Sequence, residues 1–174
     1  NTTACVTATI TVNTISVDPD SITPSSIILC TGSSSTLSVA GGTLGSAATW
    51  RWYKGSCGGQ FISTGISIIV SPTATTDYYL RAEGTCNTTM CSNETITVNI
   101  LSAAPGSVLA SPGVICNGVS SMLSFSGGSL GTGADWYWYS GSCGGTFEGI
   151  GTTLAVNPAS TTNYYDGSLN LNVA

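Results

Sequence analysis

Histidine is absent from this sequence of 174 residues, and charged side chains make up only 6% of it. The only cations, Arg51, Lys54 and Arg81, are too few to form a basic patch that neutralises phosphates. No apolar run approaches the roughly 20 residues that cross a bilayer. We therefore expect neither a nucleic-acid partner nor membrane insertion.

The same scarcity argues against catalysis. Without histidine, no serine or cysteine has its usual general base, and the eight carboxylates form no spaced pair that recurs along the chain. Asp18 and Asp20 offer oxygen ligands that suit calcium, but Ala104 and Gly106 occupy the matching positions of the repeat described below. We expect no enzymatic activity, no cofactor and no metal.

Cysteine and hydroxyl side chains are plentiful instead. The chain has 7 cysteines without a CxxC pair, which favours disulfides formed in an oxidising compartment over a zinc or redox centre. It also has 26 serines and 26 threonines, which suit an uncharged polar surface of β-strands. The composition therefore indicates an extracellular or cell-surface protein.

An internal repeat organises the chain. Residues 29–59 recur as residues 115–145 without insertion or deletion, so that Cys30 and Cys116 lie 86 residues apart. The same offset matches residues 1–5 to 87–91 and residues 9–13 to 95–99. The chain thus opens with the sequence of the last strand of a repeat, and the second copy diverges after Tyr165.

Apolar residues alternate with polar ones in short runs bounded by glycine and proline, which predicts about seven antiparallel strands in each repeat. With a tryptophan on the central strand, this pattern is typical of an immunoglobulin-like sandwich. We predict an all-β chain of two tandem immunoglobulin-like β-sandwiches. Its parts are a detached N-terminal strand (1–13), a first domain (14–99) and a second domain without a regular terminal hairpin (100–174).

The stretches SGGSLGTGADWYWYSGSCGG and SPTATTDYYLRAEGTCNTTMC resemble the immunoglobulin-like repeats of secreted and cell-surface proteins of Bacteroidota, of the kind found in Flavobacteria. The resemblance extends from Asn1 to about Tyr165. It implies a role in an adhesin, a gliding-associated surface protein or an extracellular fibre.

Strand order restricts the disulfides. If residues 37–39 and 50–53 are adjacent antiparallel strands of the sandwich, the segment before the first and the loop after the second lie at one end, and the last hairpin lies at the other. We therefore predict the pairs Cys30–Cys57, Cys86–Cys91 and Cys116–Cys143, with Cys30–Cys91 as the rival pairing. Cys5 is left either unpaired, as a buried thiol, or bonded between subunits.

Two surface features point to carbohydrate. Tyr53, Tyr137 and Tyr139 are expected to face outward, where they could stack on sugar rings. The triplet Asp20-Ser21-Ile22 resembles the O-glycosylation signal of Bacteroidota, so we expect a glycan on Ser21 in a linker between domains.

The displaced strand suggests how the protein assembles. A sandwich without its last strand exposes an apolar groove and unpaired backbone groups. We predict that Val6, Ala8, Ile10 and Val12, or the alternate set if the register slips, fill this groove in the second domain of a neighbouring subunit. The partner is then the chain itself, joined head to tail in an extracellular filament.

Two alternatives remain open. Residues 168–173 could fold back as an abbreviated last strand, which would close the second domain without a donor. The chain could also be an adhesin repeat that binds a surface glycan or another surface, rather than a filament subunit.

Overall fold

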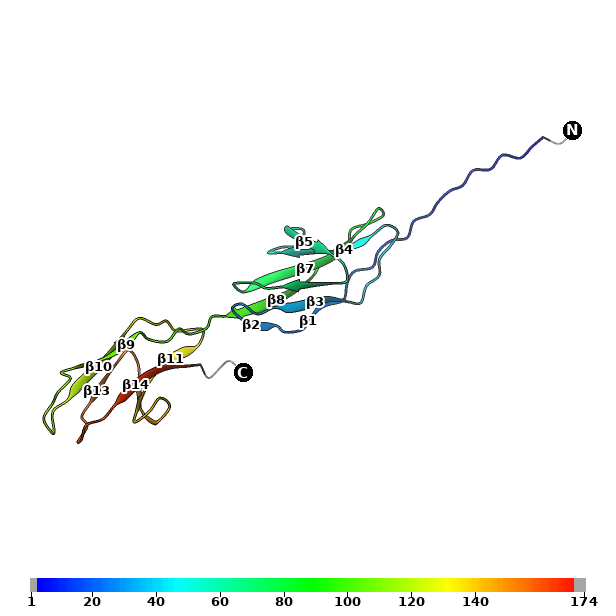
Figure 1. The fold of residues 1–174 in the computed structure, drawn as a ribbon. Helices are drawn as coiled ribbons and strands as arrows, with labels where there is room; N and C mark the ends of the chain where they lie inside the picture. The colour runs from blue at the N-terminus through cyan, green and yellow to red at the C-terminus, as the bar shows by residue number, and fades with distance from the viewer. Residues whose placement is uncertain (1–2, 171–174) are drawn as a thin grey trace. The chain divides into compact units, whose positions relative to one another are not determined.

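The computed structural model describes residues 3–170, and the chain divides into two compact units, Asn1–Val98 and Asn99–Ala174 (Figure 1). All regular structure in residues 3–170 is β-strand, which confirms the predicted all-β class. The described residues contain no helix with the length and apolarity of a membrane span. The division between the units falls one residue before the predicted boundary after Asn99.

The first unit is a sandwich of two β-sheets. Its strands are β1 (Ser21–Pro24), β2 (Ile28–Cys30), β3 (Ser35–Ala40), β4 (Thr49–Lys54), β5 (Gln60–Thr64), β6 (Ser67–Val70), β7 (Thr76–Glu83) and β8 (Ser92–Asn99). One sheet has the order β1-β3-β6 and the other the order β2-β8-β7-β4-β5. Strand β8 therefore lies inside a five-stranded sheet, between β2 and β7.

The core of the first unit lies between these sheets, because each strand turns alternate apolar residues inward. Leu37 on β3, Trp52 on β4, Leu80 on β7 and Ile96 on β8 are completely buried. The Trp52 indole N–H donates a hydrogen bond to the Gly65 carbonyl oxygen at 2.9 Å, so its one polar atom is also satisfied. Strand β8 thus contributes directly to the core.

The second unit repeats six of these strands. They are β9 (Ser107–Ser111), β10 (Ser121–Ser126), β11 (Ala134–Ser140), β12 (Thr146–Ile150), β13 (Thr153–Val156) and β14 (Tyr164–Asn170). The sheets have the orders β13-β10-β9 and β12-β11-β14. By the 86-residue offset, β14 is the counterpart of β7, and the described part of this unit has no counterpart of β2 or β8.

The core of the second unit is correspondingly smaller. Its buried cluster within the described residues consists of Leu123, Trp138 and Val156, and the Trp138 indole donates to the Gly151 carbonyl at 2.8 Å, as Trp52 does to Gly65. Where the first unit has the buried Leu80, the second has Asp166. Both Asp166 carboxylate oxygens are buried without a well-formed hydrogen bond among the described residues.

The end of β14 bears on one of the alternatives. Ser168, Leu169 and Asn170 pair with Trp136, Asp135 and Ala134 of β11, so they continue β14. The expectation that residues 168–173 fold back as an abbreviated last strand is therefore wrong for residues 168–170, and residues 171–173 lie outside the described part of the chain. The long register with β11 explains this, since it pairs these three backbone positions already.

Candidate subunit interface

The N-terminal segment, residues 3–13, is extended and has no strand partner (Figure 1). Within the described chain it makes no hydrogen bond, and all of its residues are exposed. Val6, Ile10 and Val12 are 97%, 87% and 85% exposed. A soluble chain rarely leaves three alternating β-branched residues in water. This segment has the pattern of a strand without a sheet.

The counterpart of this segment is β8, and residues 9–13 repeat residues 95–99 letter for letter. In β8 the alternate positions turn inward: Ile96 is 0% exposed and Val98 is 8% exposed. The matching positions of the free segment are Val6, Ala8, Ile10 and Val12, for Ser92, Glu94, Ile96 and Val98. The free segment is thus a more apolar version of a strand that is buried in the first unit.

The second unit carries a groove of about 400 Å³. Its lining includes residues 114–116, Thr162 just before β14, Tyr164 at the start of β14, and Leu123 and Val156. Two of these, Leu123 and Val156, belong to the core cluster, so the groove reaches down to the core.

The counterparts of the residues that line this groove lie beside the second half of β8 in the first unit. There, β8 pairs with Thr76 and Tyr78 of β7, whose counterparts are Thr162 and Tyr164. On its other side β8 pairs with β2, whose counterpart, residues 114–116, forms no strand. Tyr78 is 4% exposed, whereas Tyr164 is only half-buried. In the described part of the second unit, residues 114–116 therefore lack a strand partner, and one edge of β14 is uncovered.

The chain leaves both strand sequences in the same way. Directly after β8, the Ile100 N–H donates to the Thr132 hydroxyl at 2.9 Å within the second unit. Directly after the free segment, the Thr14 N–H donates to the Ser46 hydroxyl at 2.9 Å within the first unit. Thr14 and Ser46 are the repeat counterparts of Ile100 and Thr132. The residue that follows each of these two strand sequences is therefore hydrogen-bonded in the same way.

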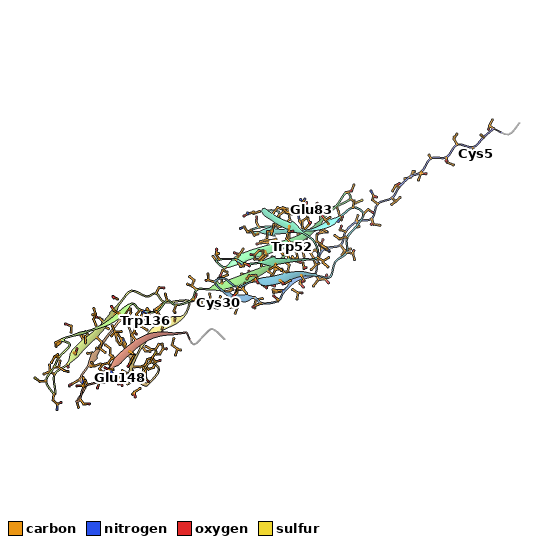
Figure 2. The ribbon with its side chains drawn as sticks, viewed as in Figure 1. Cys5, Cys30, Trp52, Glu83, Trp136 and Glu148 are labelled. Carbon is orange, nitrogen blue, oxygen red and sulfur yellow. A yellow bond between two sulfur atoms is a disulfide. The ribbon has the colours of Figure 1, made fainter. Side chains whose placement is uncertain are left out.

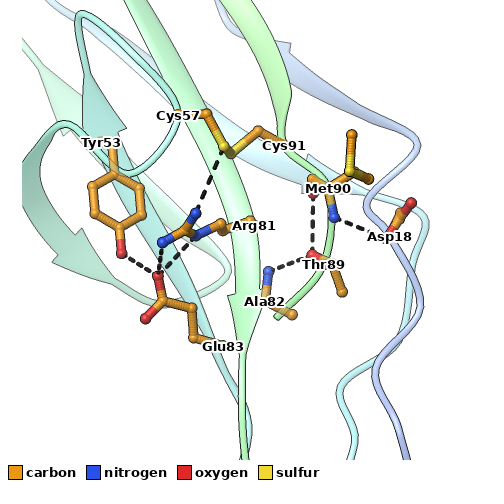
Figure 3. Close-up of a disulfide and its surroundings, with 9 residues drawn as sticks. All are labelled: Asp18, Tyr53, Cys57, Arg81, Ala82, Glu83, Thr89, Met90 and Cys91. Carbon is orange, nitrogen blue, oxygen red and sulfur yellow. Dashed lines mark hydrogen bonds and ion pairs between the residues drawn. A yellow bond between two sulfur atoms is a disulfide. The ribbon is translucent and has the colours of Figure 1, made fainter. Parts of the chain in front are cut away.

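The disulfide differs from the predicted pairs. Cys57 is bonded to Cys91, with Cα atoms 5.9 Å apart (Figure 3). Cys30, Cys86, Cys116 and Cys143 are free thiols. The predictions of Cys30–Cys57, Cys86–Cys91 and Cys116–Cys143 are therefore wrong, as is the rival pair Cys30–Cys91.

Sheet order explains the correction. Cys30 ends β2, and β8 and β7 separate β2 from β4, a distance of about 14 Å in strand spacings, which exceeds the reach of a disulfide. Cys57 instead sits in the β4–β5 loop, which turns back over the sheet so that its Sγ lies 3.8 Å from Arg81 Nη1 of β7 (Figure 3). Cys91 immediately precedes β8 on that side, whereas Cys86 lies exposed in the β7–β8 turn.

Cys5 is a free, exposed thiol on the extended segment (Figure 2). Exposure contradicts its interpretation as a buried thiol. Cys86 and Cys91 both belong to the segment that joins β7 and β8, and β8 has no counterpart among the described residues of the second unit.

Sequence reasoning did not find a charged cluster on the outer face of the five-stranded sheet. Arg51 Nη1 donates to Glu83 at 2.7 Å, Arg81 Nε donates to Glu83 at 2.8 Å, and the Tyr53 hydroxyl donates to the same carboxylate. Burial alone raises the pKa of Glu83, but these hydrogen bonds outweigh it and lower the pKa to about 2. The sequence did contain a signal for this cluster, because Arg51 and Arg81, two of the three cations, occupy outward positions on adjacent strands.

This cluster also corrects the expectation for Tyr53. The Arg81 guanidinium lies 5.1 Å from the centre of the Tyr53 ring and Phe61 packs at 5.9 Å, which leaves Tyr53 5% exposed. A sugar cannot stack on that ring. In the second unit Tyr137 and Tyr139 are half-buried and flank Phe147, at 6.0 and 6.3 Å between ring centres.

The remaining predicted sites are placed as follows. Ser21 is exposed but begins the edge strand β1, opposite Ala40, rather than lying in a linker, and its glycosylation stays a prediction. Asp18 accepts a hydrogen bond from the Met90 N–H at 3.1 Å. Residues 3–170 contain no cluster of side chains that could hold a metal ion.

Two β-sheets packed around a buried tryptophan of a central strand define the first unit as an immunoglobulin-like β-sandwich. Residues 20–100, which include β1 to β8, match the family described as "Ig-like domain CHU_C associated". This is a Bacteroidota-associated domain found in surface proteins and generally without enzymatic activity, which confirms the resemblance seen in the sequence. No curated protein matches the chain.

Proposed function

We propose that the chain is a non-enzymatic structural subunit of an extracellular bacterial filament, assembled from copies of itself by strand donation. Residues 3–13 of one copy occupy the groove in the second unit of the next. The observation that carries the proposal is the match between the two: the groove lacks the strand whose sequence the free segment repeats.

The repeat supplies the register of the donated strand. In the first unit β8 pairs Ile96 with Thr76, Glu94 with Tyr78 and Ser92 with Leu80. Transferred by the 86-residue offset, Ile10 lies opposite Thr162, Ala8 opposite Tyr164 and Val6 opposite Asp166. In this register Val6, Ala8, Ile10 and Val12 face the core of the receiving unit, which includes Leu123 and Val156 in the groove.

The donor and receiver are different copies because of where the chain enters and leaves the first unit. Near the start of β8, the Asp18 carboxylate accepts a hydrogen bond from the Met90 N–H, and the Ser92 hydroxyl donates one to the Pro19 carbonyl at 2.7 Å. The segment by which the chain enters the first unit therefore lies at the start of β8. The chain leaves at the other end of β8, which is eight residues or about 27 Å long. The chain therefore enters the first unit at one end of β8 and leaves it at the other.

Head-to-tail contacts of this kind do not close on themselves. Each copy carries one donor strand and one groove, and they are different surfaces, so every added copy presents a new free end. The result is a linear polymer. An extracellular location fits the disulfide and the family of surface domains that the first unit matches.

Negative-stain microscopy of a chain that starts at Thr14 tests the proposal. Because residues 3–13 make no contact with the first unit, their removal should leave both units folded. We expect filaments from the full chain and only single copies from the shortened one. Filaments of unchanged appearance from the shortened chain would rule out strand donation.

The second candidate is an adhesin module that binds glycan. The favouring observation is the aromatic group of Tyr137, Tyr139 and Phe147 on the outer face of the second unit, with Phe147 55% exposed. An adhesin module should remain a single copy and lose glycan-array binding on Phe147→Ala. A filament subunit should polymerise equally with and without that substitution.

A further inference from the structure

The disulfide of the first unit attaches β8 to the sheet. Cys91 immediately precedes β8, and Cys57 lies in the loop between β4 and β5 (Figure 3). The bond therefore links the beginning of the last strand to a loop that is 34 residues earlier in the chain. The bond therefore keeps the start of β8 beside the sheet even when the hydrogen bonds of the strand open.

Each of these two cysteines has a counterpart, but the counterparts lie far apart in the chain. Cys143, in the loop between β11 and β12, corresponds to Cys57. Cys5, directly before Val6 of the free segment, corresponds to Cys91. Both are free and exposed. Hence the β11–β12 loop of the second unit carries one half of the disulfide and the free segment carries the other.

The loop of the second unit is already shaped for the bond. The two loops share their left-handed turns, with φ of 82° at both Gly55 and Gly141, and of 72° and 71° at Gly58 and Gly144. They also share a backbone hydrogen bond of 3.0 Å, from Gly59 to Ser56 and from Gly145 to Ser142. Cys143 is thus held by the same backbone conformation that presents Cys57 to Cys91.

The path between the two counterparts is open. In the first unit the side chain of Arg81 fills the space beside Cys57, with its Nη1 3.8 Å from Cys57 Sγ. Gly167 stands at the matching position of β14, and a Cβ placed on it would meet no atom within 4 Å. A strand that enters the groove therefore meets no side chain from this position between its Cys5 and Cys143.

We propose that a disulfide between Cys5 of the donor copy and Cys143 of the receiving copy locks each junction of the filament. This inference rests on the strand donation proposed above and adds a covalent bond to it. Each copy uses Cys5 once and Cys143 once, so the bonds link any number of copies into one linear covalent chain.

The bond forms by thiol–disulfide exchange with a small-molecule disulfide such as oxidised glutathione. The Cys5 thiolate attacks one sulfur of that oxidant, which breaks its S–S bond, forms a mixed disulfide and releases one thiol. The Cys143 thiolate then attacks the Cys5 sulfur and displaces the second thiol. The two cysteines lose two electrons and two protons, and the oxidant leaves as two thiols that carry them.

Non-reducing gel electrophoresis of assembled full-length chain tests the lock, after incubation with oxidised glutathione and blocking of free thiols with N-ethylmaleimide. We expect a ladder in steps of 17.5 kDa that collapses to single copies on reduction. Cys5→Ser and Cys143→Ser should each abolish the ladder while filaments remain visible by microscopy. The matched control Cys86→Ser should keep it, because Cys86 is a free, exposed thiol in the β7–β8 turn of the first unit and contributes to neither the donor strand nor the groove.

Mixing the two variants sharpens the result. Cys143→Ser copies can only donate a thiol and Cys5→Ser copies can only receive one, so the mixture should give covalent dimers and no longer species. Filaments without a ladder, or a ladder that survives Cys5→Ser, would overturn the lock but leave strand donation standing. Absence of both filaments and ladder would overturn strand donation itself, and the lock with it.

Discussion

Ile10 is the residue of the donor strand on which assembly should depend most. It is 87% exposed in the free segment, whereas its counterpart Ile96 is completely buried in β8. Truncation of a buried isoleucine to alanine costs about 2–5 kcal/mol, and the open second unit can partly collapse around the change, so we take about 2–4 kcal/mol. At tenfold for each 1.4 kcal/mol, Ile10→Ala should raise the critical concentration for polymerisation roughly 30- to 700-fold.

Thr9→Ala is the matched control on the same strand. Its counterpart Thr95 faces solvent, where its hydroxyl donates to Asp77 at 2.6 Å, and Asn163 takes the place of Asp77 in the second unit. Loss of one exposed hydrogen bond costs at most about 1 kcal/mol, or about fivefold in critical concentration. The assay is the protein concentration left in the supernatant after ultracentrifugation. Equal critical concentrations for Ile10→Ala and Thr9→Ala would refute the inward register of Ile10.

Three further predictions concern the stability of the two units. Because folding lowers the pKa of Glu83 from 4.5 to about 2, the ionised carboxylate stabilises the first unit above pH 4.5 by at most about 3 kcal/mol. This stabilisation is lost as the pH falls from 4.5 through 2, so the urea midpoint of the first unit should fall over that range. Glu83→Gln should make the urea midpoint less dependent on pH. Reduction of Cys57–Cys91, which closes a loop over a separation of 34 residues, should lower the free energy of unfolding of the first unit by about 3–4 kcal/mol, and a urea midpoint unchanged by dithiothreitol would contradict this. Burial raises the pKa of Asp166, and the nearby Gly167 amide offsets this increase only in part, so the stability of the second unit should decline as the pH rises through the raised pKa. Asp166→Leu should therefore stabilise the second unit at pH 7 by about 1–3 kcal/mol in calorimetry. The control Asp135→Leu, at an exposed position of β11, should not.

The sandwich could be predicted because the alternation of apolar and polar residues and the internal repeat are both visible in the sequence itself. Trp52 and Trp138 mark the central strand of each unit, and both are completely buried. The strand sequence of the free segment could also be recognised, since residues 9–13 copy residues 95–99. Comparison of one repeat with the other identifies β8 as the strand without a counterpart among the described residues of the second unit. Its donation to another copy stays a proposal.

Pairing across the sheet face was not predictable in the same way. Strand order places the loop that contains Cys57 at one end of the sandwich, but the loop turns back over β7 and reaches Cys91. Tyr53 likewise has the sequence position of an outward residue and is covered by Arg81 from the neighbouring strand. Both depend on side chains that meet through space, which neither periodicity nor strand order encodes.

Amide hydrogen exchange of the shortened chain, residues 14–174, with a synthetic peptide of residues 1–13 tests strand donation most directly. The peptide should bind with one-to-one stoichiometry and slow exchange along the open edge of β14 and in residues 114–116, which lack a strand partner without it. A peptide with aspartate in place of Ile10 and Val12 should leave exchange unchanged. Exchange in β14 that is the same with and without the native peptide would contradict strand donation.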